Sequence, residues 1–357
     1  MTVLPPGSTI GILGGGQLGR MLALAAARLG LKCHIFAPEP DSPAFQIAAA
    51  HTLAGYRDEA ALSRFASSVD AVTYEFENVP VEAVSFLETL RPVRPGSKAL
   101  RIAQDRLLEK RLARDLGART ADFASVNSRE ELDQRTEQIG LPAILKTRRF
   151  GYDGKGQASI RSGTDTDTAY AAMKGQPAIL ESLVPFELEA SVVAVRGNDG
   201  AFTAYDVVEN EHRNHILHRS RVPARLSPDV CAEAIAIARR IADALDYAGA
   251  FAVEYFIMGG QLFVNEIAPR VHNSGHWTLD ACLVSQFEQH IRAVAGWPLG
   301  STARHSDVAM INLLGDDVDG WRQLAAEPNT AVHLYGKAEA RPGRKMGHVN
   351  RLTPRQP

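Results

Sequence analysis

The sequence predicts an α/β protein with a parallel α/β domain, then an α+β region, then a small β domain. Three observations predict this order. The first hundred or so residues alternate short apolar strands with helical segments, a pattern typical of βαβ units. Beyond Leu141–Pro142, short strands joined by Gly or Asn/Asp turns indicate antiparallel sheet. After residue 300, two more short strand patterns follow. At 357 residues, the chain has room for about two or three domains.

The first domain is predicted to span residues 1–97 and to end in the Pro/Gly-rich joint at 91–97. A glycine turn at 14–19 separates its first strand from its first helix, and Gly30 closes that helix as a C-terminal cap. Strands are expected at 8–13, 32–36 and 71–76, and helices at 20–29 and 59–67.

The second domain is predicted over residues 98–300 and the third over 301–357. Helical patterns cover 98–116, 231–245 and 279–294. A hairpin of strands 250–257 and 262–267 turns around Gly259–Gly260. Other short strands are expected at 143–146, 157–161, 178–181, 189–195, 202–209, 309–313 and 331–335.

Composition excludes several classes of protein. The chain is 45% hydrophobic and 22% charged with a net charge of -2, which is a globular composition without the basic face of a nucleic-acid-binding protein. Its three cysteines lie far apart, which disfavours a disulfide framework or a zinc site. The opening residues lack the charged start of a signal peptide, and no apolar run is long enough to span a membrane. We therefore expect a cytoplasmic protein.

The glycine turn at residues 14–19 matches the pattern GxGxxG between a strand and a helix. Such a turn lets a phosphate approach the helix N-terminus, where free N–H groups favour an anion. With Glu39 as the acidic partner, the turn is compatible with a nicotinamide-dependent dehydrogenase. However, Glu39 lies in a Pro-rich loop, so a sugar phosphate or a purely structural turn are the alternatives.

A lysine-bearing strand precedes a Gly-rich loop. Lys146 ends the strand at 143–146, and residues 148–157 follow with three glycines and Lys155. Backbone N–H groups of this loop and both lysines are suited to a phosphate chain, although GxxxxGK[ST] is absent. The alternative is an ordinary Gly-rich hairpin. Downstream, Glu181 ends an apolar strand whose backbone can bind an adenine edge, or it is a simple strand-end charge.

Two glutamates lie in apolar surroundings on the predicted hairpin. If residues 259–261 form its loop, Glu254 and Glu266 stand opposite each other on one face. Opposed like charges are destabilising, and a divalent cation such as Mg²⁺ would turn the repulsion into ligation, with Asn265 as a nearby neutral oxygen. Slippage of the register by one residue is the alternative. His212 and the two histidines that follow at intervals of three lack metal-ligand partners, so we expect single polar contacts there.

These features in this order resemble the ATP-grasp superfamily. Longer motifs resemble one family within it, the N5-carboxyaminoimidazole ribonucleotide synthetases of purine biosynthesis, from about residue 9 to 350. The motifs HNSGHW and RKMGH resemble this family more than its relatives, the formate-dependent glycinamide ribonucleotide transformylases. The motifs that carry the resemblance are GGGQLGR (14–20), TYEFENV (73–79), QDRLLEK (104–110), GYDGKGQ (151–157), NEIAPRVHNSGHW (265–277) and LYGKAEARPGRKMGH (334–348).

The resemblance implies an ATP-grasp fold and ATP- and bicarbonate-dependent carboxylation of 5-aminoimidazole ribonucleotide through carboxyphosphate. It assigns the glycine turn to the ribonucleotide instead of a dinucleotide, and it implies a homodimer. It assigns Mg²⁺, with Mn²⁺ as a substitute, to Glu254 and Glu266, and catalytic roles to Arg270, Lys155 and Asn273. The ribonucleotide positions are Gln17, Leu18, Glu75, Asn273, Lys337, Arg344 and Lys345. The ATP positions are Arg106, Lys146, Gly151, Tyr152, Asp153, Gly154, Lys155, Gly156, Gln157, Glu181, Ser182, Leu183, Val184, Glu189, His212, Asn265 and Glu266.

Overall fold

The computed structural model describes residues 3–151 and 154–355, which contain three β-sheets. The N-terminal sheet has four strands in the order β3-β2-β1-β4, and all its pairings are parallel, as predicted. After β1, β2 and β3, a helix or a short connection returns the chain to the end of the sheet where the next parallel strand begins. The elements are β1 (Thr9–Leu13), α1 (Gln17–Arg28), β2 (Lys32–Ala37), β3 (Ala50–Leu53), α2 (Glu59–Ser67), β4 (Ala71–Tyr74) and α3 (Val81–Glu88).

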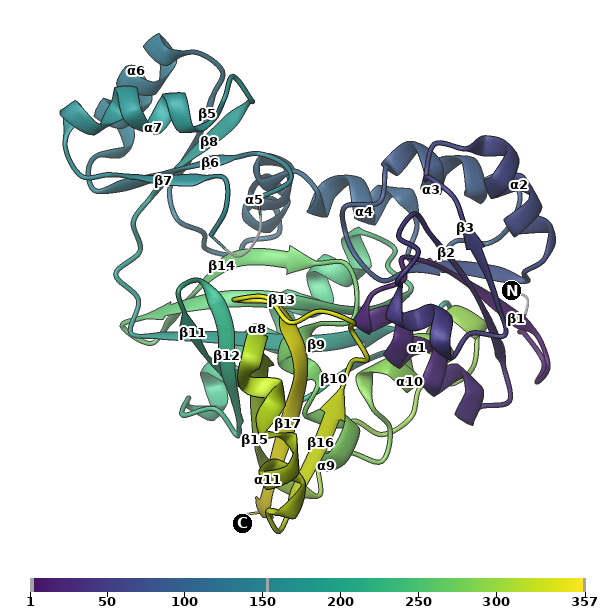
Figure 1. Ribbon diagram of the computed structural model, residues 1–357. Helices are drawn as coiled ribbons and strands as arrows, with labels where there is room; N and C mark the ends of the chain where they lie inside the picture. Colours follow the sequence, from purple (N-terminus) through teal and green to yellow (C-terminus); the bar gives the residue numbers. More distant parts are fainter. Residues whose placement is uncertain (1–2, 152–153, 356–357) are drawn as a thin grey trace.

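A second sheet forms a small lobe, at the upper left of Figure 1. Its four strands are antiparallel in the order β5-β8-β6-β7, and helices α6 and α7 pack on it. The strands are β5 (Phe123–Val126), β6 (Ala143–Thr147), β7 (Gln157–Ile160) and β8 (Ala178–Ser182), and the helices are α6 (Arg129–Ile139) and α7 (Thr166–Ala172).

The third sheet has nine strands and continues without a break into the C-terminal part of the chain. Its order is β14-β13-β9-β11-β12-β15-β17-β16, and β10 pairs with β9. The pairing of β12 with β15 joins the central region to the C-terminal strands, while the division into domains at residues 97 and 300 stays a prediction. The strands are β9 (Leu188–Arg196), β10 (Phe202–Ala204), β11 (Val208–Arg213), β12 (Ile216–Val222), β13 (Gly249–Met258), β14 (Gln261–Ala268), β15 (Ser306–Leu314), β16 (Thr330–Leu334) and β17 (Lys345–Pro354).

Three predicted elements are each divided in two. The helix predicted at 98–116 is α4 (Ser97–Ala103) and α5 (Arg106–Asp115), because Asp105 is extended and its carboxylate accepts a hydrogen bond from Leu107 N–H as an N-cap. The strand at 202–209 is divided into β10 and β11, and the helix at 279–294 into α9 (Thr278–Ala281) and α10 (Gln286–Ala295).

The remaining helices are α8 (Pro228–Ala244) and α11 (Trp321–Ala326), with 3-10 helices η1 (Pro43–Gln46), η2 (Gly163–Asp165), η3 (Asn273–Gly275) and η4 (Gly315–Gly320). Among the described residues, no helix combines the length and the apolar character that crossing a membrane requires.

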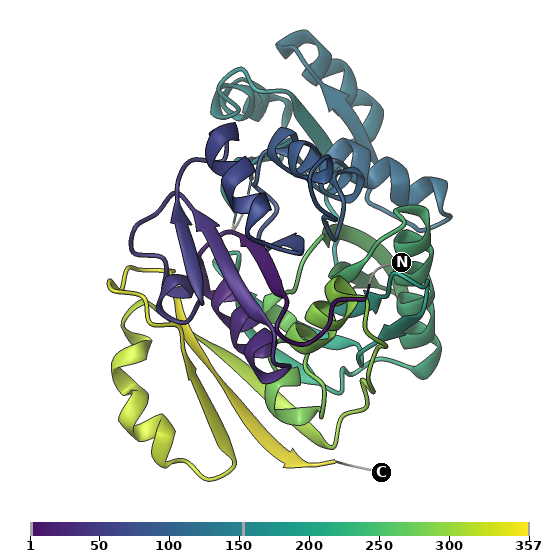
Figure 2. The same cartoon turned by 90° about the vertical axis from the view of Figure 1, so that its right-hand side faces the viewer.

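The N-terminal sheet docks on the large sheet through α10. Ile10 and Ile12 of β1 belong to one hydrophobic cluster with Leu22 of α1 and Ile291 of α10, so these two helices cover one face of the parallel sheet. In Figure 2 the C-terminal strands (yellow) run beside the N-terminal sheet (purple). There the Gln46 side-chain amide donates to the Gly336 carbonyl at 3.0 Å. The first and last parts of the chain therefore meet.

His290 of α10 connects this helix to two sheets from a fully buried position. Its Nδ1 accepts from Ala250 N–H at 3.0 Å, and its Nε2 lies 2.8 Å from the Thr73 hydroxyl. Because Nδ1 is an acceptor, the ring is neutral and Nε2–H donates to Thr73. Burial lowers the pKa of His290 to about 4.

We predict a loss of stability in acid that depends on His290. The unfolded chain binds a proton near the ordinary pKa of 6.5, whereas the folded chain does so only near 4, so stability falls across this interval. The contribution of this one group by pH 4 is roughly 3 kcal/mol. Urea unfolding between pH 7 and pH 4 should show a steeper loss for the wild type than for His290→Gln. Equal slopes would contradict the prediction.

Candidate active site

The β13–β14 hairpin opposes Glu254 and Glu266 by a route that differs from the predicted one. The turn has two residues, Gly259 and Gly260, both with positive φ, and Met258 pairs with Gln261. From that turn, regular pairing would place Asn265 opposite Glu254. A bulge between Glu254 and the next pair shifts the register by one residue, and Glu266 takes that place. The opposition is confirmed, but the predicted three-residue loop is wrong.

The opposed carboxylates repel each other, and Glu254 is the more buried, with 14% of its side chain exposed against 38% for Glu266. Burial and the charge of Glu266 raise the pKa of Glu254 to about 8. Arg106 partly compensates, with its Nη1 at 3.4 Å from Glu266 Oε2. Over residues 3–151 and 154–355, no group of three or more His, Cys, Asp or Glu is arranged as a metal site. Two carboxylate oxygen donors fit Mg²⁺, which commonly takes its other ligands from substrate phosphates and water.

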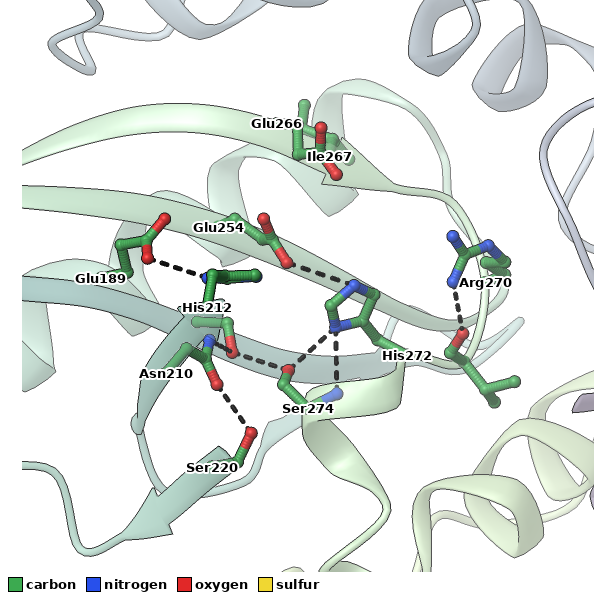
Figure 3. A network of polar contacts seen from close by, with 12 residues as sticks. Glu189, Asn210, His212, Ser220, Glu254, Glu266, Ile267, Arg270, His272 and Ser274 are labelled. Atoms are coloured by element: carbon green, nitrogen blue, oxygen red, sulfur yellow. Dashed lines mark hydrogen bonds and ion pairs between the residues drawn. The ribbon is translucent and has the colours of Figure 1, made fainter. Parts of the chain in front are cut away.

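A chain of polar contacts leads from Glu254 to Asn210 (Figure 3). His272 Nε2 lies 3.2 Å from Glu254 Oε1, and its Nδ1 lies 2.8 Å from the Ser274 hydroxyl. The Ser274 hydroxyl contacts that of Ser191 at 2.7 Å, and Asn210 Nδ2 donates to Ser191. Burial and the nearby charge of Arg270 lower the pKa of His272 well below its usual value. A neutral His272 that accepts from Ser274 on Nδ1 carries its proton on Nε2, the ring nitrogen next to Glu254.

Arg270 is held by Glu77, a residue to which sequence reasoning gave no role. The two side chains form a bidentate pair, with Nη2 at 3.0 Å from Oε1 and Nε donating to Oε2. Burial would lower the pKa of Arg270, but the charge of Glu77 outweighs it and raises that pKa. Both Glu77 and His272 lie inside motifs that the sequence singled out. Their partners are about 20 to 190 positions away, so spacing along the chain could not find them.

Lys146 and Glu181 meet inside the small lobe. Lys146 Nζ lies 2.9 Å from Glu181 Oε2, and Lys110 Nζ from α5 lies 3.6 Å from the same oxygen. Burial would raise the pKa of Glu181, but Lys110 and Lys146 outweigh it and lower that pKa to about 2. Glu181 Oε1 is buried and has no hydrogen-bond partner among the described residues. Glu181 is therefore no solvated strand-end charge, and one oxygen can accept from a ligand.

The Gly-rich loop between β6 and β7 lies against the large sheet. Arg106 Nη2 donates to the Gly151 carbonyl at 3.1 Å, and a Cβ at Gly154 would come within 2.7 Å of the His215 ring, in the β11–β12 turn. The loop and the hairpin thus share Arg106. Of the loop positions predicted to bind ATP, the structure describes Gly151, Gly154, Lys155, Gly156 and Gln157, whereas Tyr152 and Asp153 lie outside the described residues.

Other predicted ATP positions lie along β8 and β9. Ser182 and Leu183 donate their backbone N–H groups to the carbonyls of residues 122 and 142, and the Val184 carbonyl accepts from the amide at 186. Glu189 Oε2 lies 2.8 Å from His212 Nδ1. Burial would lower the pKa of His212, but this contact and the neighbouring carboxylates raise it. The three spaced histidines fall on β11, a turn and β12, so no helix aligns them.

The glycine turn before α1 encloses a carboxylate of the protein itself. Glu75 accepts hydrogen bonds from the backbone N–H groups of Gly16 and Gly19. A Cβ at Gly14 would come within 2.4 Å of Glu75 Cγ, so the glycines make room for this side chain. The N-terminus of α1 already has its anion there, which disfavours a dinucleotide pyrophosphate on the same amides. Gln17 and Leu18 begin this helix.

The C-terminal basic residues are more buried than a solvated tail. Lys337 Nζ donates to the Lys345 carbonyl at 2.6 Å, and burial together with the charge of Arg344 lowers the pKa of Lys337 to about 8. The charge of Glu75 acts on Lys337 in the opposite direction, so the N- and C-terminal groups share one electrostatic environment. Asn273, in η3, has both side-chain polar atoms buried without a partner among the described residues, so both atoms are available for hydrogen bonds.

Three protein families match the chain in succession. Residues 7–104 match the ribonucleotide synthetase preATP-grasp domain, residues 111–287 the ATP-grasp domain, and residues 308–356 the phosphoribosylaminoimidazole carboxylase C-terminal domain. The N5-carboxyaminoimidazole ribonucleotide synthase of Brucella melitensis is 50% identical over 357 residues, which cover 99% of each chain.

Two solved structures are similar over almost the whole chain. A crystal structure of the ADP complex of an N5-carboxyaminoimidazole ribonucleotide synthetase has a TM-score of 0.96 and 44% identity, covering 99% of this chain and 94% of the other. The synthase of Aspergillus clavatus, in complex with ADP and 5-aminoimidazole ribonucleotide, has a TM-score of 0.92 and 32% identity, covering 98% and 94%. The predicted ATP-grasp fold is confirmed.

We predict that Glu254→Gln stabilises the metal-free protein. The amide has the same shape as the carboxylate and can keep its place beside His272, while the charge that Glu266 repels is gone. Because the folded pKa of Glu254 lies above its unfolded value, the wild type loses stability as pH rises from 4.5 through about 8. In a chelator at pH 8, the variant should be more stable by about 1 kcal/mol or more. The gain should vanish at pH 4.5. A lower melting temperature at pH 8 would contradict the prediction.

Proposed function

The chain belongs to the N5-carboxyaminoimidazole ribonucleotide synthase family, and we propose that it carboxylates 5-aminoimidazole ribonucleotide with ATP and bicarbonate through carboxyphosphate. It is an ATP-dependent ligase that forms a carbon–nitrogen bond. The observation that carries the proposal is the opposed pair of Glu254 and Glu266. Glu266 of this pair lies 3.4 Å from Arg106, which also contacts the Gly-rich loop, so a metal–phosphate assembly would have protein partners on both sides.

The first proposed step transfers the γ-phosphoryl group of ATP to a bicarbonate oxygen. The bond between the β–γ bridging oxygen and phosphorus breaks, a new oxygen–phosphorus bond forms, and ADP leaves. Glu254 and Glu266 would hold Mg²⁺, and when bound the ion would neutralise charge on the phosphoryl oxygens. Lys146, Lys155 and Arg106 would add positive charge around the phosphates.

The second proposed step joins carbon to nitrogen. The 5-amino nitrogen of the ribonucleotide attacks the carbonyl carbon of carboxyphosphate, phosphate leaves with the bonding electron pair, and the nitrogen loses a proton. Arg270 would hold the carboxylate. Glu77 engages Nε and one Nη2 hydrogen, and the Val271 carbonyl accepts from Nη1, which leaves one N–H on each terminal nitrogen for another anion. Water would hydrolyse carboxyphosphate, so the site must exclude it during the reaction.

The ribonucleotide would bind between the N-terminal and C-terminal parts of the chain. Gln17, Leu18 and Glu75 supply one side of this site and Lys337, Arg344 and Lys345 the other. Asn273 supports this arrangement, since its amide is buried with both polar atoms unpartnered among the described residues. The cluster of basic residues suits a sugar phosphate. We further propose a homodimer, which sedimentation of the purified protein would test.

The two alternatives make different predictions about substrates. A formate-dependent glycinamide ribonucleotide transformylase would release ADP with formate and glycinamide ribonucleotide. A nicotinamide-dependent dehydrogenase would bind NADH, but Glu75 occupies the amides that a pyrophosphate would need. The deciding experiment measures ADP release with 5-aminoimidazole ribonucleotide, with and without bicarbonate. ADP release that requires the ribonucleotide and rises with bicarbonate supports the proposal, and equal release with formate and glycinamide ribonucleotide refutes it.

We predict that Glu266→Gln abolishes turnover and leaves the fold intact. One carboxylate fewer weakens Mg²⁺ binding and leaves phosphoryl oxygens without neutralising charge. ADP release should fall by about a hundredfold or more, as expected when a direct metal contact is lost. Circular dichroism should be unchanged, and thermal unfolding without metal should move little or upward. Turnover close to that of the wild type in saturating Mg²⁺ would remove Glu266 from the metal site.

We predict that Arg344→Ala weakens binding of the ribonucleotide and spares ATP. Arg344 lies beside Lys337 in the C-terminal basic cluster, where its guanidinium can donate to the 5′-phosphate. Loss of one charge-assisted contact of about 1.5–3 kcal/mol lowers kcat/KM for the ribonucleotide roughly ten- to hundredfold. Steady-state kinetics should show a raised KM for the ribonucleotide and an unchanged KM for ATP. An equal rise in both constants would place the phosphate elsewhere, with the Gln17 turn as the next candidate.

A further inference from the structure

Helix α5 presents three charged residues to strand β14. Arg106, Glu109 and Lys110 are spaced i, i+3 and i+4, so they lie on one face of the helix. Glu109 is only 2% exposed and Lys110 only 1%, although both carry groups that are ionised in water. In Figure 1, α5 lies between the small lobe and β14. Buried ionisable groups of this kind need specific hydrogen-bond partners.

The partners of Glu109 and Lys110 lie on either side of the bulge. Lys110 Nζ donates to the Val264 carbonyl at 3.0 Å, and the Glu109 carboxylate accepts from Ile267 N–H. Between these backbone groups lie Asn265, where the register shifts, and Glu266, which faces Glu254. Strand β14 is at the edge of its sheet, so its outward backbone groups have no neighbouring strand. Two adjacent side chains of α5 thus bind the two ends of the bulged segment.

We propose that Glu109 and Lys110 are positioning residues that hold the bulge of β14 and so keep Glu266 opposite Glu254. The metal role of that carboxylate pair rests on the proposed function. The bracket, which consists of the contacts of Glu109 and Lys110 with the backbone of β14, does not. If the bracket were lost, the extra residue could move along the strand, and a shift of one residue would turn Glu266 to the other face of the sheet.

Lys110 extends the same bracket to the ATP side of the site. Its Nζ also lies 3.6 Å from Glu181 Oε2, which in turn pairs with Lys146 at 2.9 Å. One lysine therefore connects the hairpin of the large sheet to the small lobe. An apolar side chain would fill the same volume without the cost of burying a charge. The ion pair of Lys110 with Glu181 therefore contributes little to stability as such. It is better explained by the need to hold the hairpin of the large sheet and the small lobe in one fixed arrangement.

The test compares four variants with the wild type. Glu109→Leu and Lys110→Met each remove one end of the bracket. Glu109→Gln keeps an oxygen that can accept from Ile267 N–H, and it is the conservative rescue. Lys98→Met is the control for loss of a lysine–carbonyl contact elsewhere, because Lys98 Nζ, on the neighbouring helix α4, donates to the Ala244 carbonyl at 2.9 Å from an exposed position.

The first readout is amide hydrogen exchange over residues 263–268 without nucleotide or metal. Exchange there should rise by about tenfold or more in Glu109→Leu and Lys110→Met, because the end of the strand opens more often. Glu109→Gln and Lys98→Met should match the wild type. The second readout is the Mg²⁺ concentration for half-maximal ADP release. It should rise roughly ten- to hundredfold in the first two variants, while the KM for the ribonucleotide stays level.

Each outcome decides one claim. Unchanged exchange in Glu109→Leu and Lys110→Met, with intact circular dichroism, would overturn the bracket. Increased exchange with an unchanged Mg²⁺ requirement would overturn the positioning role. Equal damage from Glu109→Gln and Glu109→Leu would show that the charge matters and not the hydrogen bond, which also overturns it. If the wild type released no ADP with the ribonucleotide, the proposed function would fail, and hydrogen exchange would still decide whether the bracket exists.

Discussion

The repulsion between Glu254 and Glu266 is the constraint around which the central part of this structure is arranged. Two carboxylates face each other on a largely buried sheet, which neither packing nor solvation favours. Neighbouring side chains offset part of the repulsion between the two carboxylates. Arg106 contacts one carboxylate, and neutral His272 lies 3.2 Å from the other. Because His272 is itself held by a chain of hydroxyl and amide groups, its contact with Glu254 depends on three strands and a 3-10 helix at once.

Helix α5 transmits this constraint to the rest of the molecule. The helix begins at Arg106 because Asp105 caps it, and Asp105 also pairs with Arg148 at the start of the Gly-rich loop. From the same helix, Lys110 contacts Glu181 in the small lobe and the backbone of β14 in the large sheet. The break between α4 and α5 is therefore more than an interruption of a helical pattern. The break lets α5 run in a direction of its own, so that its side chains contact both the small lobe and the large sheet.

Local patterns predicted much of this fold, and distant partners account for what they missed. The Gly259–Gly260 pair predicted the hairpin, since two glycines at positive φ suit a two-residue turn. The bulge at Asn265 was not predictable, because it depends on side chains more than 150 residues away in the sequence. The same reason explains why Glu77 and His272 had no predicted role. Asp105 was predicted to lie inside one helix, because the sequence alone does not distinguish an aspartate that caps a helix from one within it.

The glycine turn shows why a motif of six residues does not identify its anion. Residues 14–19 have the pattern, the strand and the helix that dinucleotide sites use, and their amides do bind an anion. That anion is the carboxylate of Glu75, about 60 positions later in the sequence. Because the Glu75 carboxylate takes the amides of Gly16 and Gly19, a substrate phosphate needs other donors. The basic residues around Lys337 lie within electrostatic reach of Glu75, because the large sheet carries the last strands back to the first domain. The proposed ribonucleotide site therefore depends on residues from both ends of the chain.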